Sequence, residues 1–195
     1  MSPIIPYGDP AFDPAWLSLI QHDPVHPSIP LEKRITGNRT LYVYVHDNIP
    51  QFMVCVRVGN RLPHTMIDIL EDDDYHSKFD VSYAIFYSIF RLPGATQKGA
   101  GTLAIKSLIA YCRAQGVQGF YTLSPAPQMR EHFKQKPSEA DIRKYLEAFE
   151  GPVARFHLNN GARIHSINFN ADMSVQRIDE SWGIMVNYDY NFCDR

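Results

Sequence analysis

Residues 94–127 read GATQKGAGTLAIKSLIAYCRAQGVQGFYTLSPAP, and this stretch decides the fold. After a glycine-rich turn, apolar residues recur at three- and four-residue spacing, which predicts an amphipathic helix with one buried face. The apolar positions are Leu103, Ile105, Leu108, Ile109 and Cys112. Gly116 is placed to end this helix, and residues 120–123 are typical of a strand. Pro125 and Pro127 are expected to stop the strand because proline cannot donate to a sheet.

The turn at residues 97–102, QKGAGT, has the composition of an anion-binding loop. Glycines let backbone N–H groups approach a phosphate, and the start of a helix adds a favourable dipole. Lys98 would add a point charge. A plain connection between a strand and a helix has the same appearance, so both interpretations stay open for the turn taken alone.

The composition is that of a globular protein with one core. The 195 residues are 45% apolar and 21% charged, with a formal net charge of -2. This charge gives no basic field for nucleic acid, and no apolar run approaches the length of a membrane span. The N-terminus lacks the pattern of a signal peptide, so the expected location is cytoplasmic.

The cysteines argue against a disulfide framework or a zinc cluster. Cys55, Cys112 and Cys193 are odd in number and have no paired spacing. The first two lie in apolar patterns and are expected in the core. No metal site is expected from the cysteines and histidines.

Residues 1–33 are expected to form a proline-rich N-terminal arm. Seven of the fourteen prolines lie in the first thirty residues, which favours extended and irregular backbone. A short helix is predicted at residues 14–21. A disordered tail is the alternative, but Trp16 and its apolar neighbours count against it. They indicate that the arm packs on the domain or across a partner subunit.

From residue 40 the pattern predicts a mixed α/β domain. The expected strands lie at 41–45, 52–58, 80–90, 120–123, 162–170 and 183–190, and the strand at 80–90 is the central one. Asp47, Asn48 and Pro50 predict a hairpin between the first two of these strands. Further helices are predicted at 64–72, after a capping box at Ser138, and at 152–161. The first of these should turn Met66, Ile67, Ile69 and Leu70 inward. The acidic run at 71–74 is expected to be a solvated loop.

The succession of strand, glycine turn, helix and strand predicts a right-handed crossover with a ligand crevice at the strand ends. Ser124 lies where the second of these strands ends. Its hydroxyl could donate to a substrate carboxylate or act as a nucleophile, although no Gly-x-Ser-x-Gly elbow surrounds it. A serine in an ordinary turn is the structural alternative.

His157 and the last strand supply the other candidate groups. On the helix predicted at 152–161, Val153, Phe156 and Asn160 share one face, and His157 is expected at its border. An imidazole titrates near neutrality, which suits proton transfer, although packing histidines are more common. On the last strand, Asn187, Tyr188 and Tyr190 could bring polar groups to a pocket edge, or the tyrosines could be core residues.

Four motifs follow one another along the chain. They are AIFYSI at 84–89, TLSP at 122–125, PVARFHLNNGA at 152–162 and MVNYDY at 185–190. In this order and spacing they resemble the catalytic domain of the malonyl-CoA decarboxylase family, over residues 34–190. The resemblance implies an α/β (α+β) fold of the GNAT acyltransferase type, with a mixed sheet, flanking helices and a coenzyme A crevice.

The same resemblance implies decarboxylation of malonyl-CoA, or a related carboxyacyl-CoA, to acetyl-CoA and carbon dioxide through a thioester enolate. It identifies Ser124 and His157 as catalytic, with Ser124 on the carboxylate and His157 delivering the proton, or with these roles exchanged. Tyr190 is the third catalytic candidate and lines the site. No cofactor is expected apart from the coenzyme A of the substrate.

The resemblance also implies where the substrate binds. Coenzyme A is expected on the turn formed by Gln97, Lys98, Gly99, Ala100, Gly101 and Thr102. Further substrate contacts are expected from Tyr87, Ser88, Thr122 and Asn187. The arm at 1–33 stands in place of the family's helical N-terminal domain, so we expect a short form with the catalytic domain at 34–195.

Two alternatives stay open beside the decarboxylase. One is a GNAT acyltransferase that moves an acyl group from coenzyme A to an amine or a carrier-protein thiol, with or without decarboxylation. The other is a catalytically silent acyl-CoA-binding module. The expected partners are therefore the acyl-CoA, an amine or carrier protein in the transferase, and a second subunit bound through the arm; neither nucleic acid nor a membrane is expected.

Overall fold

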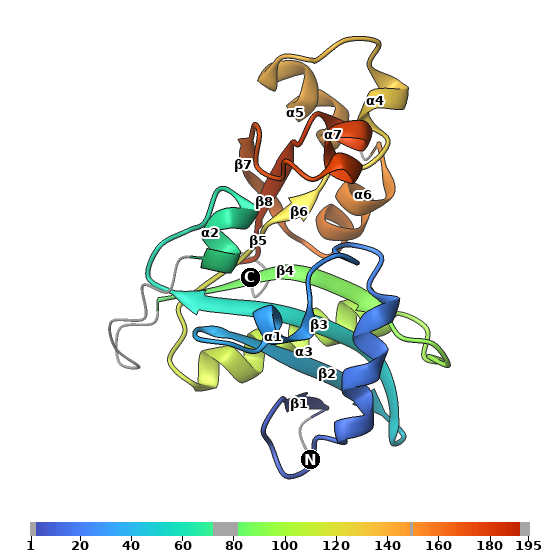
Figure 1. Ribbon diagram of the computed structural model, residues 1–195, viewed down its shortest axis with the longest axis vertical. Coiled ribbons are helices and arrows are strands. Elements are labelled where there is room, and N and C mark those ends of the chain that lie inside the picture. Colours follow the sequence, from blue (N-terminus) through green and yellow to red (C-terminus); the bar gives the residue numbers. More distant parts are fainter. Residues whose placement is uncertain (1–2, 72–81, 149, 192–195) are drawn as a thin grey trace. The chain divides into compact units, whose positions relative to one another are not determined.

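The computed structural model describes residues 3–71, 82–148 and 150–191 (Figure 1). These residues divide into two compact units. The first unit comprises residues 3–61 and 82–118, and the second comprises residues 62–71, 119–148 and 150–191. The division into an arm at 1–33 and a catalytic domain at 34–195 stays a prediction. The right-handed crossover also stays a prediction, because its two strands belong to different units.

The first unit is built on an antiparallel sheet. Its strands are β1 (Ile4–Pro6), β2 (Arg39–His46), β3 (Ile49–Gly59) and β4 (Tyr83–Arg91), paired in that order. Between β2 and β3, Asp47 and Asn48 have φ values of 50° and 62°, the left-handed backbone of a tight hairpin turn. The predicted hairpin is thereby confirmed, and Cys55 and Cys112 are both buried and free as expected.

The helix α3 (Ala100–Ala114) packs against this sheet (Figure 1). Its buried face contains Ile105, Leu108, Ile109 and Cys112. Leu103, by contrast, is 39% exposed, so its predicted burial is wrong. It lies two positions before Ile105, which places it about 200° around the helix from that buried residue. Gly116 has a φ of 92° and ends the helix as predicted.

The N-terminal arm is part of the first unit. The strand β1, which the sequence did not predict, pairs with β2. The predicted helix exists as the 3₁₀ helix η1 (Pro14–His22), capped by the Asp13 side chain, and the short α1 (Leu31–Arg34) follows. The arm is thus held by its own chain, and its exchange between subunits stays a prediction.

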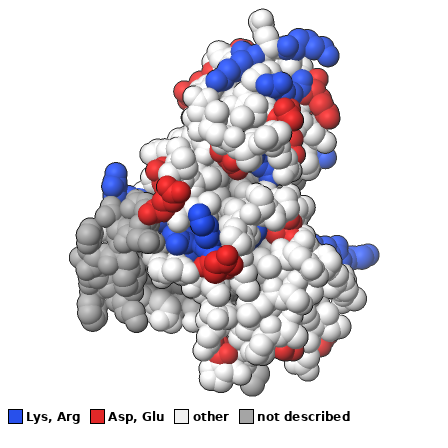
Figure 2. All heavy atoms as spheres, in the orientation of Figure 1, with Lys and Arg blue, Asp and Glu red and all other residues white. Residues whose placement is uncertain are grey.

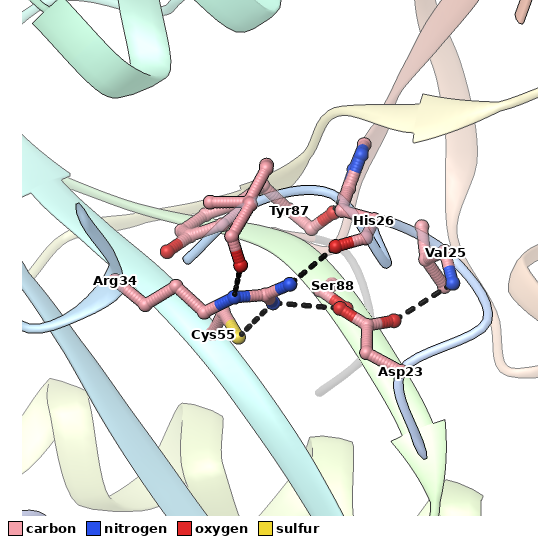
Figure 3. Close-up of polar contacts among 8 residues, drawn as sticks. Asp23, Val25, His26, Arg34, Cys55, Tyr87 and Ser88 are labelled. Atoms are coloured by element: carbon pink, nitrogen blue, oxygen red, sulfur yellow. Dashed lines mark hydrogen bonds and ion pairs between the residues drawn. The ribbon is translucent and has the colours of Figure 1, made fainter. Parts of the chain in front are cut away.

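A buried ion pair anchors the arm to the sheet (Figure 3). The Arg34 guanidinium donates to a carboxylate oxygen of Asp23 at 2.6 Å and to the sulfur of Cys55 at 3.3 Å. The hydroxyl of Ser88 on β4 donates to the same Asp23 oxygen at 2.8 Å. Burial raises the pKa of the Cys55 thiol to about 12, so it stays protonated and acts as a packing group.

The second unit has the central strand β8 (Met185–Asp189), whose five residues are all buried. It pairs antiparallel with β5 (Gly119–Thr122), β6 (Ser124–Pro125) and β7 (Arg163–Asn168). The helices are α2 (Met66–Glu71), α4 (Met129–His132), α5 (Glu139–Glu147), α6 (Pro152–Asn159) and α7 (Val175–Ser181). The predicted capping box is confirmed, because the side chains of Ser138 and Asp141 bond reciprocally to the backbone at the start of α5.

Two predictions about the second unit are wrong, and one helix was missed. Pro125 does not stop the strand, since the chain pairs with β8 again at β6, where Pro125 lies opposite Met185. Ile67 is 64% exposed, because a six-residue helix can bury only one narrow face, here that of Met66 and Ile69. The polar helix α7 was not predicted. The acidic run at 71–74, the start of the strand at 80–90, and Cys193 lie partly or wholly outside the described residues.

Charged side chains of both signs lie close together on the surface shown in Figure 2, in keeping with the formal net charge of -2. Within the described ranges, no helix combines the length and the apolar character needed to cross a membrane.

Candidate active site

The second unit brings Ser124 and His157 into direct contact. The Ser124 hydroxyl oxygen lies 2.9 Å from Nε2 of His157, and the two residues are 6% and 3% exposed. Ser124 is the first residue of β6, and His157 is on α6. The prediction that His157 lies at the border of the face shared by Val153, Phe156 and Asn160 is wrong, because Ala154 and His157 are the buried residues of this helix.

Tyr190 occupies the other side of the imidazole. Its hydroxyl oxygen lies 2.8 Å from Nδ1 of His157, and the tyrosine is 1% exposed. The residue follows β8 directly, and its backbone N–H donates to the carbonyl of Phe120 at 2.9 Å. The ring of Tyr188 stacks on the imidazole, with centroids 4.5 Å apart and planes inclined by 23°. The orientation of His157 is therefore fixed by one ring and two hydroxyls.

Burial keeps the imidazole neutral. The pKa of His157 is lowered to about 3 because the site is removed from water, which disfavours the charged form. A neutral imidazole carries one N–H and one free lone pair in the ring plane. His157 can therefore donate a hydrogen bond on one side and accept one on the other.

Thr122 connects Ser124 to the rest of the sheet. The hydroxyl oxygens of Thr122 and Ser124 lie 3.0 Å apart, and the backbone N–H of Tyr188 donates to the Thr122 hydroxyl at 3.3 Å. Asn187 donates to the carbonyl of Thr122 at 2.8 Å and to that of Pro63 at 3.2 Å. Ser124 is thus held through its neighbour two residues earlier.

The carboxamide of Asn187 has protein partners on both of its ends. Its oxygen accepts from the Ser166 hydroxyl at 2.8 Å and from the Asn168 amide at 2.6 Å. Nδ1 of His64 lies 2.9 Å from the Asn168 oxygen and extends the network to the start of α2. Since all four hydrogen-bonding positions of Asn187 are filled by protein groups, its contact with substrate stays a prediction.

The glycine turn lies in the first unit and is organised by a residue that sequence analysis missed. The side-chain oxygen of Gln51 accepts the backbone N–H groups of Thr96 and Gln97 at 2.8 and 2.9 Å. Gly99 then takes a φ of 68° as the residue before α3. Gln51 lies in the alternating pattern of β3, which gives no sign of this partner because the contact spans 45 residues.

The remaining residues of the turn lead into the first turn of α3 and differ in their exposure. Lys98 is exposed, Ala100 and Gly101 are buried, and Thr102 is half-buried. The side-chain oxygen of Gln97 is buried and has no hydrogen-bond partner among the described residues. The turn therefore leads into α3 through the left-handed Gly99, and its binding of coenzyme A stays a prediction.

Tyr87 and Ser88 also belong to the first unit. The Ser88 hydroxyl donates to Asp23, and Tyr87 is 1% exposed, with its carbonyl 3.1 Å from Nε2 of His26. Their contacts here are with the arm, and their binding of substrate stays a prediction. The predicted site residues thus form two groups: Ser124, His157, Tyr190, Thr122 and Asn187 in the second unit, and the turn with Tyr87 and Ser88 in the first.

Comparison with known proteins matches the C-terminal part of the second unit to a family model. Residues 139–194, which include His157 and Tyr190, match the malonyl-CoA decarboxylase C-terminal domain. A 39-residue stretch is 54% identical to the mitochondrial malonyl-CoA decarboxylases of Rattus norvegicus and Mus musculus. It covers 20% of this chain and 8% of each of those proteins, so the match spans only a small part of the curated relatives.

Solved structures extend the similarity over the described fold. The malonyl-CoA decarboxylase of Agrobacterium vitis has a TM-score of 0.76 and 24% identity, and covers 98% of this chain and 60% of that chain. The enzyme of Rhodopseudomonas palustris has a TM-score of 0.73 and 25% identity with the same coverage. The GphF GNAT-like decarboxylase in complex with isobutyryl-CoA has a TM-score of 0.68 and 17% identity, and covers 95% of this chain and 97% of that one. The expected resemblance and the GNAT-like α/β fold are both confirmed.

Proposed function

We propose that this chain decarboxylates malonyl-CoA to acetyl-CoA and carbon dioxide through a thioester enolate. The observation that carries the proposal is the buried contact of 2.9 Å between the Ser124 hydroxyl and Nε2 of His157. These two residues lie in the TLSP and PVARFHLNNGA motifs, which suggested the reaction from the sequence. The family match over residues 139–194 supports the same assignment.

The reaction sets three tasks for the protein. It must hold the carboxylate so that the breaking C–C bond is aligned, stabilise the enolate oxygen, and deliver a proton to the enolate carbon. Ser124 is assigned to the carboxylate, because a hydroxyl can donate to it. His157 is assigned to the proton, because it is the titratable side chain in direct contact with Ser124.

Coenzyme A is assigned to the turn of the first unit. The first N–H groups of α3 have no carbonyl partner within the helix, and they can donate to a phosphate. Lys98 is exposed beside them and adds a positive charge. Gly99 has a left-handed backbone, and a Cβ built on it would have no atom within 4 Å. The space beside its Cα is therefore open to a ligand.

Acyl transfer to an amine or a carrier thiol is the second candidate function. The same fold occurs in the Bacillus subtilis acetyltransferase in complex with CoA, at a TM-score of 0.55 and 9% identity. A transferase would form product only when an acceptor is added, whereas a decarboxylase forms acetyl-CoA from malonyl-CoA alone. A single incubation of the protein with malonyl-CoA and no acceptor therefore distinguishes the two functions.

The test is incubation of the full chain with malonyl-CoA and no acceptor, with acetyl-CoA measured by mass-resolved chromatography. We expect acetyl-CoA from the wild type and losses of roughly 10²–10⁴-fold in Ser124→Ala and His157→Gln, the range for removal of a positioned acid or base. Ser18→Ala, which removes an exposed hydroxyl from η1, is the matched control and should retain activity. Intact malonyl-CoA with the folded wild type would contradict the proposal.

A further inference from the structure

Each ring nitrogen of His157 has a hydroxyl partner, and this fixes how protons can be distributed in the site. Ser124 is 2.9 Å from Nε2, and Tyr190 is 2.8 Å from Nδ1. A neutral imidazole has a single N–H, so the two contacts must run in opposite directions. If Nε2 carries the proton, Nδ1 accepts from Tyr190; if Nδ1 carries it, Nε2 accepts from Ser124.

The role assigned to Ser124 decides between these two arrangements. When Nδ1 carries the proton, the Ser124 hydrogen is directed to Nε2 and cannot reach a substrate carboxylate. When Nε2 carries it, the Ser124 oxygen accepts from the imidazole, and its hydrogen, which in this structure is donated to the Thr122 hydroxyl at 3.0 Å, can turn to a substrate carboxylate. The nitrogen beside Ser124 is also the one that must hold the proton for the enolate carbon. Both roles therefore require the tautomer with the proton on Nε2.

We propose that Tyr190 is a positioning residue that holds neutral His157 with its proton on Nε2, and that it replaces this proton when His157 gives it to the substrate carbon. The inference rests on the proposed function and extends it to a residue that acts through the imidazole. Tyr190 acts by donating its phenolic O–H to Nδ1, over the 2.8 Å contact.

The proton transfer balances without a charged imidazole. The breaking C–C bond of malonyl-CoA leaves its electron pair on the thioester enolate as carbon dioxide departs. The enolate carbon then takes the proton from Nε2, and Nδ1 takes the proton of Tyr190. The resting state returns after the product leaves, when Nε2 takes a proton from water and the Nδ1 proton moves back to the Tyr190 phenolate. Because the carbon of a thioester enolate is a much stronger base than a phenolate, the overall transfer is favourable.

The surroundings of His157 support this route over one through an imidazolium. The residue is 3% exposed, and its lowered pKa disfavours a second proton at neutral pH. If Tyr190 did not supply a proton, the loss of the Nε2 proton would leave a buried imidazole anion. The stacked Tyr188 ring keeps both nitrogens aimed at their hydroxyl partners during the transfer.

The ring nitrogens of His157 can be observed directly in the full chain labelled with ¹⁵N-histidine. The His157 signals are identified by their loss in His157→Gln. We expect a protonated Nε2 and an unprotonated Nδ1 between about pH 5 and pH 8, and a shift of population toward the Nδ1–H tautomer in Tyr190→Phe. Tyr7→Phe removes a hydroxyl from a residue that is 40% exposed and should leave both signals unchanged. A wild type with the proton on Nδ1 would overturn the proposal.

Kinetics and a conservative replacement complete the test. We expect Tyr190→Phe to lower kcat for acetyl-CoA formation by roughly 10²-fold or more, with KM little changed. Should Tyr190→Phe not fold, 3-fluorotyrosine at position 190 keeps the shape and makes the phenol a stronger acid, and the Nδ1 signal must then move. The proposal would be overturned by an Nδ1 signal that does not move in the 3-fluorotyrosine protein, or by an unchanged kcat in folded Tyr190→Phe. If the wild type does not decarboxylate malonyl-CoA, the proposed function fails, and the nitrogen signals still decide the tautomer.

Discussion

The carboxamide of Asn187 donates to the backbone carbonyl of Thr122 at 2.8 Å, and both residues are fully buried. This contact ties β8 to the end of β5, two residues before Ser124. Ser124 pairs with Val186 on the same β8 strand. The position of the reactive hydroxyl is therefore set by the sheet and by one side-chain amide, and these relationships lead to specific expectations.

Removal of the Asn187 amide should destabilise the second unit. Asn187→Ala leaves several buried groups unpaired, including the Thr122 carbonyl and the Asn168 amide, and each unsatisfied group costs about 1–3 kcal/mol. We expect a loss of at least about 2 kcal/mol in urea denaturation. Asn159→Ala, at the exposed end of α6, should change stability by no more than about 0.5 kcal/mol. Equal effects of the two substitutions would refute the proposed role of Asn187.

The buried His157 should make the folding stability dependent on pH. Its pKa is about 3 in the folded protein, whereas an unperturbed histidine has a pKa of about 6.5. As the pH falls below about 6.5, the unfolded chain binds a proton at this residue that the folded chain does not, so the free energy of unfolding falls. The contribution is at most about 1.4 kcal/mol per pH unit. It is fully present above the unfolded pKa and is lost as the pH falls from about 6.5 toward about 3.

Denaturation of the wild type and His157→Gln at several pH values between about 7.5 and 5 isolates this contribution. The difference in stability between the two proteins should shift in favour of His157→Gln as the pH falls. Parallel stability curves would mean that His157 titrates alike in the folded and unfolded states.

The Arg34–Asp23 ion pair should be essential to the first unit. Asp23→Ala leaves the Arg34 guanidinium buried without its carboxylate and deprives the Ser88 hydroxyl of its acceptor. Breaking a buried pair in this way costs about 3–5 kcal/mol. As a control, Glu139→Ala removes the exposed pair with Arg143, which is 3.4 Å long, and should cost less than about 1 kcal/mol. Urea denaturation of both variants measures the contrast, and a mild effect of Asp23→Ala would show that the arm is not held by this pair.

The turn proposed to bind coenzyme A should depend on Gln51. Gln51→Met keeps the side-chain length but removes the acceptor for the N–H groups of Thr96 and Gln97. We expect coenzyme A to bind roughly tenfold more weakly by calorimetry, which corresponds to about 1.4 kcal/mol. Lys106→Met, on the exposed side of α3, should bind as the wild type does. Unchanged binding in Gln51→Met would remove the turn from the coenzyme A site.

The sequence predicted those features that depend on local patterns. The α3 helix, the Asp47–Asn48 hairpin turn and the Ser138 capping box each arise from residues within a few positions of one another. Ser124 and His157 were predicted because their motifs resemble a family. The three- and four-residue spacing that identified α3 did not define its buried face at the first turn, so Leu103 was predicted to be buried although it is exposed.

The features that were missed depend on contacts distant in sequence. Asp23 meets Ser88 across 65 residues, and Asn187 meets Thr122 across the same separation. Neither Asp23 nor Gln51 lies in a motif, and their partners Ser88 and Thr96 cannot be identified from the local sequence. The helix α7 was missed because its sequence, VQRIDES, is mostly polar and has no apolar stripe.

The most direct test of the central claim is a double-mutant cycle between Ser124 and His157. Acetyl-CoA formation from malonyl-CoA is measured as kcat/KM for the wild type, Ser124→Ala, His157→Gln and the double variant. If the two residues act as one unit across their 2.9 Å contact, the double variant should be about as slow as the slower single variant. A double variant slowed by the product of the two single effects would mean that Ser124 and His157 act independently, and would contradict the account.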